Sequence, residues 1–165
     1  MGKRTAETTW DFIFDLKARL KNRVQLSSDA FEPYLNAVEA AFGRDVDYAQ
    51  IVKSYEETAA GRGRYSPPRI VSVEKDEKIG YPAMDLVSTS LVERQNLTIR
   101  MQVRRLTRLT NAFSKKVENL KAAMDLHFTH YNFVRFHKTI RCTPAMEAGV
   151  ARSPLTVKEL VEMAA

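Results

Sequence analysis

Apolar residues recur at helical spacing in the first quarter of the chain, which predicts two amphipathic helices. The first is predicted over residues 5–22, and its apolar stripe consists of Phe12, Ile13, Leu16 and Leu20. The second begins at Glu32-Pro33 and ends at Gly43, because proline suits the first turn of a helix and glycine the position after its last turn. Its apolar stripe consists of Tyr34, Leu35, Val38 and Phe42. Each helix therefore has one face to bury against another layer.

Strand patterns alternate with these helices. Residues 24–28 predict a short strand that runs into Asp29, and residues 46–52 alternate in polarity as a second strand does. The side of that second strand predicted to be buried carries Val46, Tyr48 and Val52. Residues 70–73 predict a third short strand. This order of elements indicates an α/β fold with few strands for its number of helices.

Connecting segments and two further helices complete the predicted organisation. Residues 54–68, which contain Gly61-Arg-Gly-Arg64, predict a loop, and the polar residues 75–81 predict a mobile segment. One helix is predicted from Thr89 to about Leu109 and a longer one over residues 114–136. The buried stripe of the longer helix is predicted to be Val117, Leu120, Met124, Phe128 and Tyr131. We divide the chain into residues 1–142 and a tail of short helices over residues 143–165.

Charge is distributed unevenly. The net charge is +6, yet residues 94–141 contain eleven Lys or Arg against two acids, which gives this segment +9. Such segregation suggests a face that meets a polyanion such as nucleic acid, although a solvated helix surface has the same pattern. No apolar run is long enough to predict a membrane span or a membrane partner. The single Cys142 cannot form an internal disulfide, which suits a cytoplasmic protein.

Two carboxylates occupy positions that suit either chemistry or helix capping. Asp29 follows a strand, where open α/β sheets place functional groups, but with Glu32 it also fits a helix N-cap. Glu93 fits a capping box opened by Ser90. Its helical face continues through polar and cationic residues that suit a phosphate backbone: Asn96, Arg100 and Arg104. The residues by themselves favour capping at both positions and leave metal binding open as the alternative.

Three histidines, His127, His130 and His137, lie close together in the basic segment. No second cysteine or acidic cluster completes a zinc set at a recognised spacing. We therefore expect core, solvated or phosphate-contacting histidines rather than metal ligands.

Several stretches resemble bacterial insertion-sequence transposases of the retroviral-integrase, ribonuclease H-like superfamily. They are most similar to the transposases of the smallest classical enterobacterial insertion elements. The two most specific stretches are Ser88–Asn119 and Tyr131–Gly149. Shorter ones are Asn22–Asp29, Pro33–Gly43 and Asp47–Tyr55. The resemblance implies that Asp29 and Glu93 are the second and third of the family's three catalytic carboxylates, and that residues 1–142 are part of a DDE catalytic core.

In this family the carboxylates hold two Mg²⁺ or Mn²⁺ ions. Water first attacks a phosphodiester at the element's end, and the released 3′-hydroxyl then attacks target DNA. The resemblance thus implies DNA and a second transposase chain, a homo-oligomer or an intact transposase, as partners in the nucleoid. The residues expected to position DNA are Arg94, Asn96, Arg100, Arg104, Arg105, Arg108, Lys115, Lys116, Arg135, His137, Lys138 and Arg141.

One departure from the family concerns its first catalytic aspartate, which lies on an opening strand upstream of the first helix. Asp11 and Asp15 both fall on the helix predicted over residues 5–22, so neither fits that position. We therefore expect a partial ribonuclease H-like fold that lacks three opening strands, has a helix-rich C-terminal half and is inactive alone. The alternative is a non-catalytic protein that binds DNA or inhibits an intact transposase.

Overall fold

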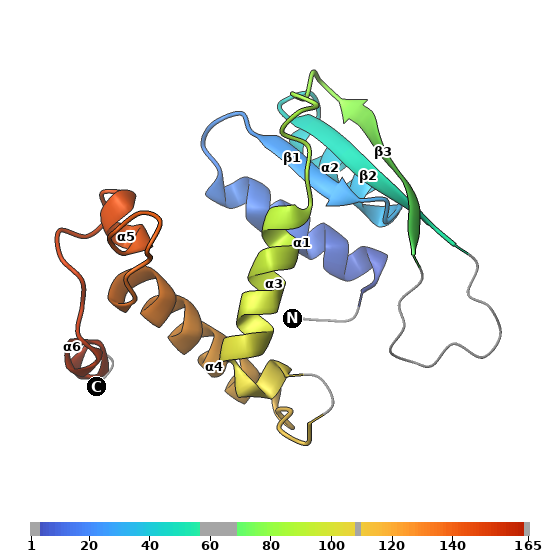
Figure 1. Cartoon of the computed structure of the whole chain (residues 1–165). Helices are drawn as coiled ribbons and strands as arrows, with labels where there is room; N and C mark the ends of the chain where they lie inside the picture. The colour runs from blue at the N-terminus through green and yellow to red at the C-terminus, as the bar shows by residue number, and fades with distance from the viewer. Residues whose placement is uncertain (1–3, 57–68, 108–109, 164–165) are drawn as a thin grey trace. The chain divides into compact units, whose positions relative to one another are not determined.

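The computed structural model describes residues 4–56, 69–107 and 110–163, and the chain divides into two compact units, residues 1–93 and residues 94–165. The first unit is mixed α/β, as predicted (Figure 1). Its elements are α1 (Ala6–Arg19), β1 (Gln25–Asp29), α2 (Pro33–Phe42), β2 (Asp47–Tyr55) and β3 (Ile70–Ile79). Helix α3 (Ser90–Gln102) begins in the first unit and continues into the second. The predicted boundary at residue 142 stays a prediction.

The three strands form one mixed sheet in the order β1-β2-β3. Strand β1 runs parallel to β2, and β3 runs antiparallel to β2. Because β3 extends to Ile79, the prediction of a mobile segment is wrong for residues 75–79. Nearly all side chains of β3 are exposed, so this strand has no buried side and its sequence shows no regular alternation of apolar and polar residues. Its backbone nevertheless pairs with β2. Of the predicted loop over residues 54–68, the first two residues belong to β2, and residues 57–68, with Gly61 to Arg64, lie outside the described residues.

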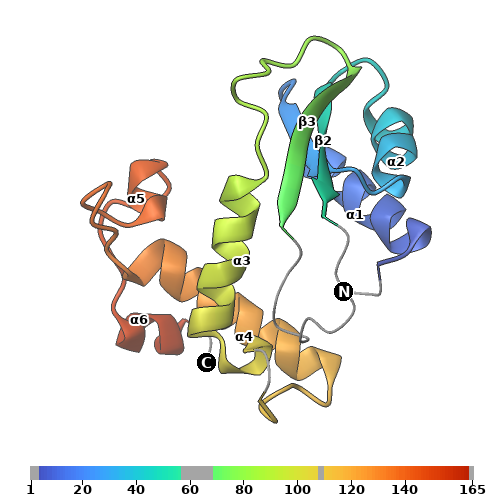
Figure 2. The same ribbon diagram turned by 45° about the vertical axis from the view of Figure 1, so that its right-hand side comes forward.

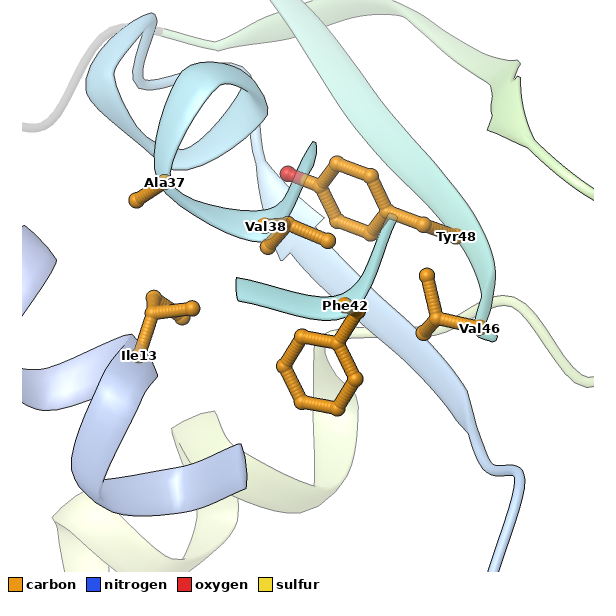
Figure 3. Packing of buried hydrophobic residues seen from close by; sticks show 6 residues of the cluster. All are labelled: Ile13, Ala37, Val38, Phe42, Val46 and Tyr48. Atoms are coloured by element: carbon orange, nitrogen blue, oxygen red, sulfur yellow. The ribbon is translucent and has the colours of Figure 1, made fainter. Parts of the chain in front are cut away.

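Helices α1 and α2 cover one face of this sheet (Figures 1 and 2). Pro33 starts α2, and Gly43 ends it with a positive φ of 56°, as the sequence predicts. The core between helices and sheet is formed by Ile13, Ala37, Val38, Phe42, Val46 and Tyr48 (Figure 3). The predicted stripe of α1 is wrong at Phe12, which is 54% exposed, because the buried side of the helix is centred on Thr9 and Ile13.

The opposite face of β2 is also buried. Ala49 and Ile51 pack against Val87, with Met84 beside them. Strand alternation predicted only one buried side, because the sequence does not show that residues 84–87 return to this face. Gln25 holds the returning segment by exchanging two hydrogen bonds with the backbone of residue 83, at 3.0 and 2.8 Å.

The second unit is helical. Helix α3 ends at Gln102 rather than near Leu109, because Val103 is extended (φ −100°, ψ 98°) and buried. After it come the 3₁₀ helix η1 (Arg104–Leu106), α4 (Val117–Thr129) and the π-helix η2 (His130–Val134). The predicted tail contains two short helices, α5 (Pro144–Glu147) and α6 (Val157–Glu162) (Figure 2).

The side chains of α4 differ from the sequence prediction. Its stripe was expected to be buried, yet none of its residues is, and Val117 is 49% exposed. Periodicity identifies which residues share a face, but it does not show that another element covers that face. No described helix combines the length and the apolar character that a membrane crossing requires.

Candidate functional site

Asp29 lies at the carboxyl end of β1, with a side chain 55% exposed. Its Oδ2 atom accepts a hydrogen bond from Arg4 Nη2 at 2.7 Å, and its Oδ1 atom accepts one from the Phe31 backbone N–H at 3.2 Å. Helix α2 begins at Pro33, and the residue at its N-cap, Glu32, makes no side-chain capping bond. The capping interpretation of Asp29 is therefore wrong for α2: Asp29 stabilises the turn after the strand, and one of its oxygens faces a cation.

Glu93 lies in the first turn of α3, and its side chain is 58% exposed. Its Oε1 atom accepts hydrogen bonds from Lys53 Nζ at 2.6 Å and from Thr89 Oγ1 at 2.9 Å. The hydrogen bond from Lys53, followed by that from Thr89, holds the pKa of Glu93 below its usual value. The backbone N–H of Ser90 donates to Ser88 Oγ at 3.1 Å, so the Ser90–Glu93 capping box is not formed.

Lys53 is a site residue that sequence reasoning missed. It follows Ile51 by two positions on β2, and Ile51 is the register partner of Asp29. Since side chains alternate along a strand, Asp29, Ile51 and Lys53 lie on the same face of the sheet. The hydrogen bond from Lys53 to Glu93 is the main cause that raises the pKa of Lys53, and burial opposes it.

A sequence signal for Lys53 exists, but it depends on the length of β2. The predicted strand stopped at residue 52, and the observed strand continues to Tyr55. Extending the alternation by one residue places Lys53 on the side of Ala49 and Ile51. Its partner Glu93 comes 40 residues later, so the pairing depends on the tertiary fold.

Two exposed carboxylates fit the ligand preference of a hard divalent cation. Mg²⁺ is commonly held by one or two carboxylates, with water and phosphate oxygens completing its coordination. Across residues 4–56, 69–107 and 110–163, no group of three or more His, Cys, Asp or Glu side chains is placed to hold a metal ion. The described residues therefore do not supply the three-carboxylate set of a two-ion site.

Asn96 and Arg100 follow Glu93 along α3 by three and seven residues, which is the spacing of one helical face. The prediction that Arg104 continues this face is wrong, because α3 ends at Gln102 and Arg104 belongs to η1. Among the apolar residues of this segment, Val103 is buried, whereas Val92 is 56% exposed.

The remaining predicted DNA-binding residues lie in the second unit, most of them exposed. Arg94, Arg104, Arg105, Lys115, Lys116, Arg135, Lys138 and Arg141 are exposed, and Arg100 and His137 are half-buried. Arg108 lies outside the described residues. Arg105 donates to Ser114 Oγ at 2.9 Å, and the His137 ring stacks edge-on against Tyr131 with centroids 4.3 Å apart. Most of these cations extend into solvent, where a phosphate backbone can reach them.

The other two histidines differ in environment. His127 is half-buried, and among the described residues its Nε2 atom has no hydrogen-bond partner. Burial, and then the charges of His130 and Arg135, lower the pKa of His127. His130 is exposed at the start of η2. The expectation that these histidines are not metal ligands stays a prediction.

Comparison of the chain with protein-family models, with curated proteins and with solved structures found no match.

Proposed function

We propose that this protein is a DNA transposase of the DDE type, or a part of one. In this proposal its core is ribonuclease H-like, and Asp29 and Glu93 are two of its metal-holding carboxylates. The observation that carries the proposal is the shared position of Lys53. Its ammonium is bonded to Glu93 at 2.6 Å, and it lies on the sheet face of Asp29, two residues beyond the register partner Ile51. Two carboxylates 64 positions apart in sequence are thus brought to one face of the sheet, as ligands of one metal ion would be.

Each part of the site has a distinct task in this proposal. A bound divalent ion would neutralise charge on a DNA phosphodiester and promote displacement at its phosphorus. Asp29 and Glu93 would hold that ion through their exposed oxygens. Lys53 positions the Glu93 carboxylate and keeps it ionised, because its hydrogen bond lowers the pKa of Glu93. The cations of residues 94–141 would hold the DNA backbone without selecting a sequence.

Metal binding is tested by titrating the protein with Mn²⁺ in a calorimeter. We expect Asp29→Asn and Glu93→Gln each to weaken Mn²⁺ binding by at least about tenfold. Asp11→Asn is the matched control, because Asp11 is an exposed acid on α1 and belongs to neither β1 nor α3. Equal Mn²⁺ affinity in all four proteins would contradict the assignment of the two carboxylates.

Lys53→Met tests whether Lys53 lies between the two ligands. Removing the ammonium is expected to raise the pKa of Glu93 and to strengthen Mn²⁺ binding, because a positive charge beside the ion is lost. Lys75→Met is the control: Lys75 pairs with Ile51 in register, but its Nζ donates to the Met84 carbonyl at 2.6 Å. Weaker Mn²⁺ binding in Lys53→Met than in the wild type would refute the placement.

DNA binding is tested by fluorescence anisotropy with a duplex of arbitrary sequence over a range of salt concentrations. The affinity is expected to fall steeply with salt, and Arg100→Ala is expected to reduce the log–log slope by about one. Lys158→Ala in α6 is the matched control, since Lys158 is an exposed cation outside the basic segment. A salt-independent affinity would contradict a role on DNA. We expect no Mg²⁺-dependent cleavage by the 165-residue chain alone, because a two-ion reaction needs a third carboxylate.

A non-catalytic DNA-binding protein is the second candidate. The observation in its favour is that Asp29 and Glu93 are already paired with Arg4 and Lys53, at 2.7 and 2.6 Å. If these carboxylates have only a structural role, salt-dependent DNA binding will occur without any Mn²⁺ binding that depends on Asp29 and Glu93. The calorimetric and anisotropy measurements together separate the two candidates.

A further inference from the structure

Helix α1 carries an aromatic pair on a side that does not face the core. Trp10 and Phe14 are 40% and 46% exposed, and their rings stack with centroids 5.6 Å apart at an interplanar angle of 15°. The core side of the same helix is marked by Ile13, which points toward α2 and the sheet (Figure 3). A stacked Trp–Phe pair left half in water is a large apolar feature for one helix to present to solvent.

The residues along this side of α1 have a symmetric order. Glu7, Trp10, Phe14 and Lys17 follow one another at intervals of three, four and three, which keeps them on one face of the helix. Reversing the direction of the helix about position 12 exchanges Trp10 with Phe14 and Glu7 with Lys17. The stripe is therefore self-complementary for an antiparallel neighbour, with an acid opposite a base at both ends.

We propose that this stripe binds a second copy of the same chain, with the two α1 helices antiparallel about a two-fold axis. Trp10 of each copy then contacts Phe14 of the other, and Glu7 of each copy lies beside Lys17 of the other. Lys17 Nζ also donates to Asp45 of its own chain at 3.0 Å and lies 4.9 Å from the centre of the Phe42 ring, so in the dimer its charge is shared between Asp45 and Glu7 of the other copy.

The charges favour a second copy in this orientation over a parallel one. In a parallel pair, Glu7 would face Glu7 and Lys17 would face Lys17, and like charges at an interface disfavour association. The aromatic core is small: four half-exposed rings would bury roughly 80 Å² each. A stable interface buries about 1,000 Å² or more, so we expect a weak dimer that dissociates on dilution. This inference does not depend on the proposed function.

Trp10 provides the assay, because it is the only tryptophan of the chain. As protein concentration rises, we expect the Trp10 emission to shift to shorter wavelength together with an increase in the sedimentation coefficient. Phe14→Ala should raise the dimer Kd by at least about tenfold, because both symmetric Trp–Phe contacts are lost. Glu7→Lys should also raise it, because the acid–base contacts become repulsive.

Phe12→Ala is the matched control, because Phe12 is 54% exposed on the same helix but lies outside the stripe. Its dimer Kd should stay within about twofold of the wild type. Three results would overturn the proposal. The first is a monomer at every concentration up to about 200 μM, and the second is an equal loss of association in Phe12→Ala and Phe14→Ala. The third is a short-wavelength Trp10 emission that does not change with protein concentration. The last result would mean that another part of the same chain covers Trp10.

Discussion

Gly80→Ala tests how the end of β3 is joined to the start of β2. Gly80 has a φ of +70°, and a Cβ atom added to it would lie 2.6 Å from the Val46 carbonyl oxygen and 2.8 Å from Arg23 Nη2. These atoms belong to a polar cluster in which Arg23 makes two hydrogen bonds to Asp47, at 2.9 and 2.6 Å. The Tyr81 backbone N–H donates to the same aspartate at 2.8 Å. Alanine at position 80 therefore cannot be accommodated without a shift of backbone.

Two separable terms contribute to the expected loss of stability. Placing a non-glycine residue at positive φ costs about 1–2 kcal/mol. Forcing a methyl group into a closely packed position adds about 1–3 kcal/mol, and here the nearest backbone atom cannot rotate away. We therefore expect Gly80→Ala to lower the free energy of unfolding by roughly 2–5 kcal/mol.

Gly43→Ala provides the matched control. Gly43 also has a positive φ, at +56°, but a Cβ atom there would meet nothing within 4 Å. With ψ at −122°, Gly43 lies in a backbone region that other residues rarely adopt, so its substitution should show only a backbone term of about 1–3 kcal/mol. The assay is urea unfolding followed by circular dichroism and by Trp10 fluorescence, with equal m-values required for the comparison. Equal losses in the two variants would refute the steric argument at Gly80.

Two further predictions concern the same unit. The hydrogen bond from Arg23, followed by that from the Tyr81 N–H, lowers the pKa of Asp47 from 3.8 to about 2. Since the folded-state pKa is depressed, this stabilisation is present above about pH 4 and is lost as pH falls toward 2. The urea midpoint of the wild type should therefore fall more steeply across this window than that of Asp47→Asn. Parallel pH profiles of the two proteins would contradict this prediction. Tyr48→Phe removes a buried hydroxyl that accepts from Gln50 Nε2 at 2.9 Å. It should lower the free energy of unfolding by about 1–3 kcal/mol, and a loss below about 0.5 kcal/mol would show that Gln50 finds another acceptor.

Much of the first unit could be predicted because its signals are local. Thr5 begins α1, while Pro33 and Gly43 bound α2, through hydrogen bonding and backbone preferences within one turn. The buried positions Ile13, Val38 and others follow from helical and strand periodicity. Asp29 and Glu93 were also recognisable as candidate ligands, although their local sequence favoured capping, which the structure does not show.

Features that depend on distant contacts were missed. Residues 75–79 form a strand because β2 supplies their hydrogen-bond partners, although their side chains show no alternation. Helix α3 ends early because burial of Val103 in an extended conformation replaces the next helical turn. Periodicity alone cannot predict either result, because it describes which side chains share a face and not which backbone groups find a partner.

The sequence by itself determined the order of β1, α2 and β2, the concentration of positive charge in residues 94–141 and the symmetric stripe of α1. These properties depend on residue spacing, which the chain carries in any environment. Only the tertiary structure decided that β2 is buried on both faces and that Lys53 lies against Glu93, 40 residues away. Contacts of that range form because the sheet brings separate segments onto one face, and no local preference encodes which segments meet.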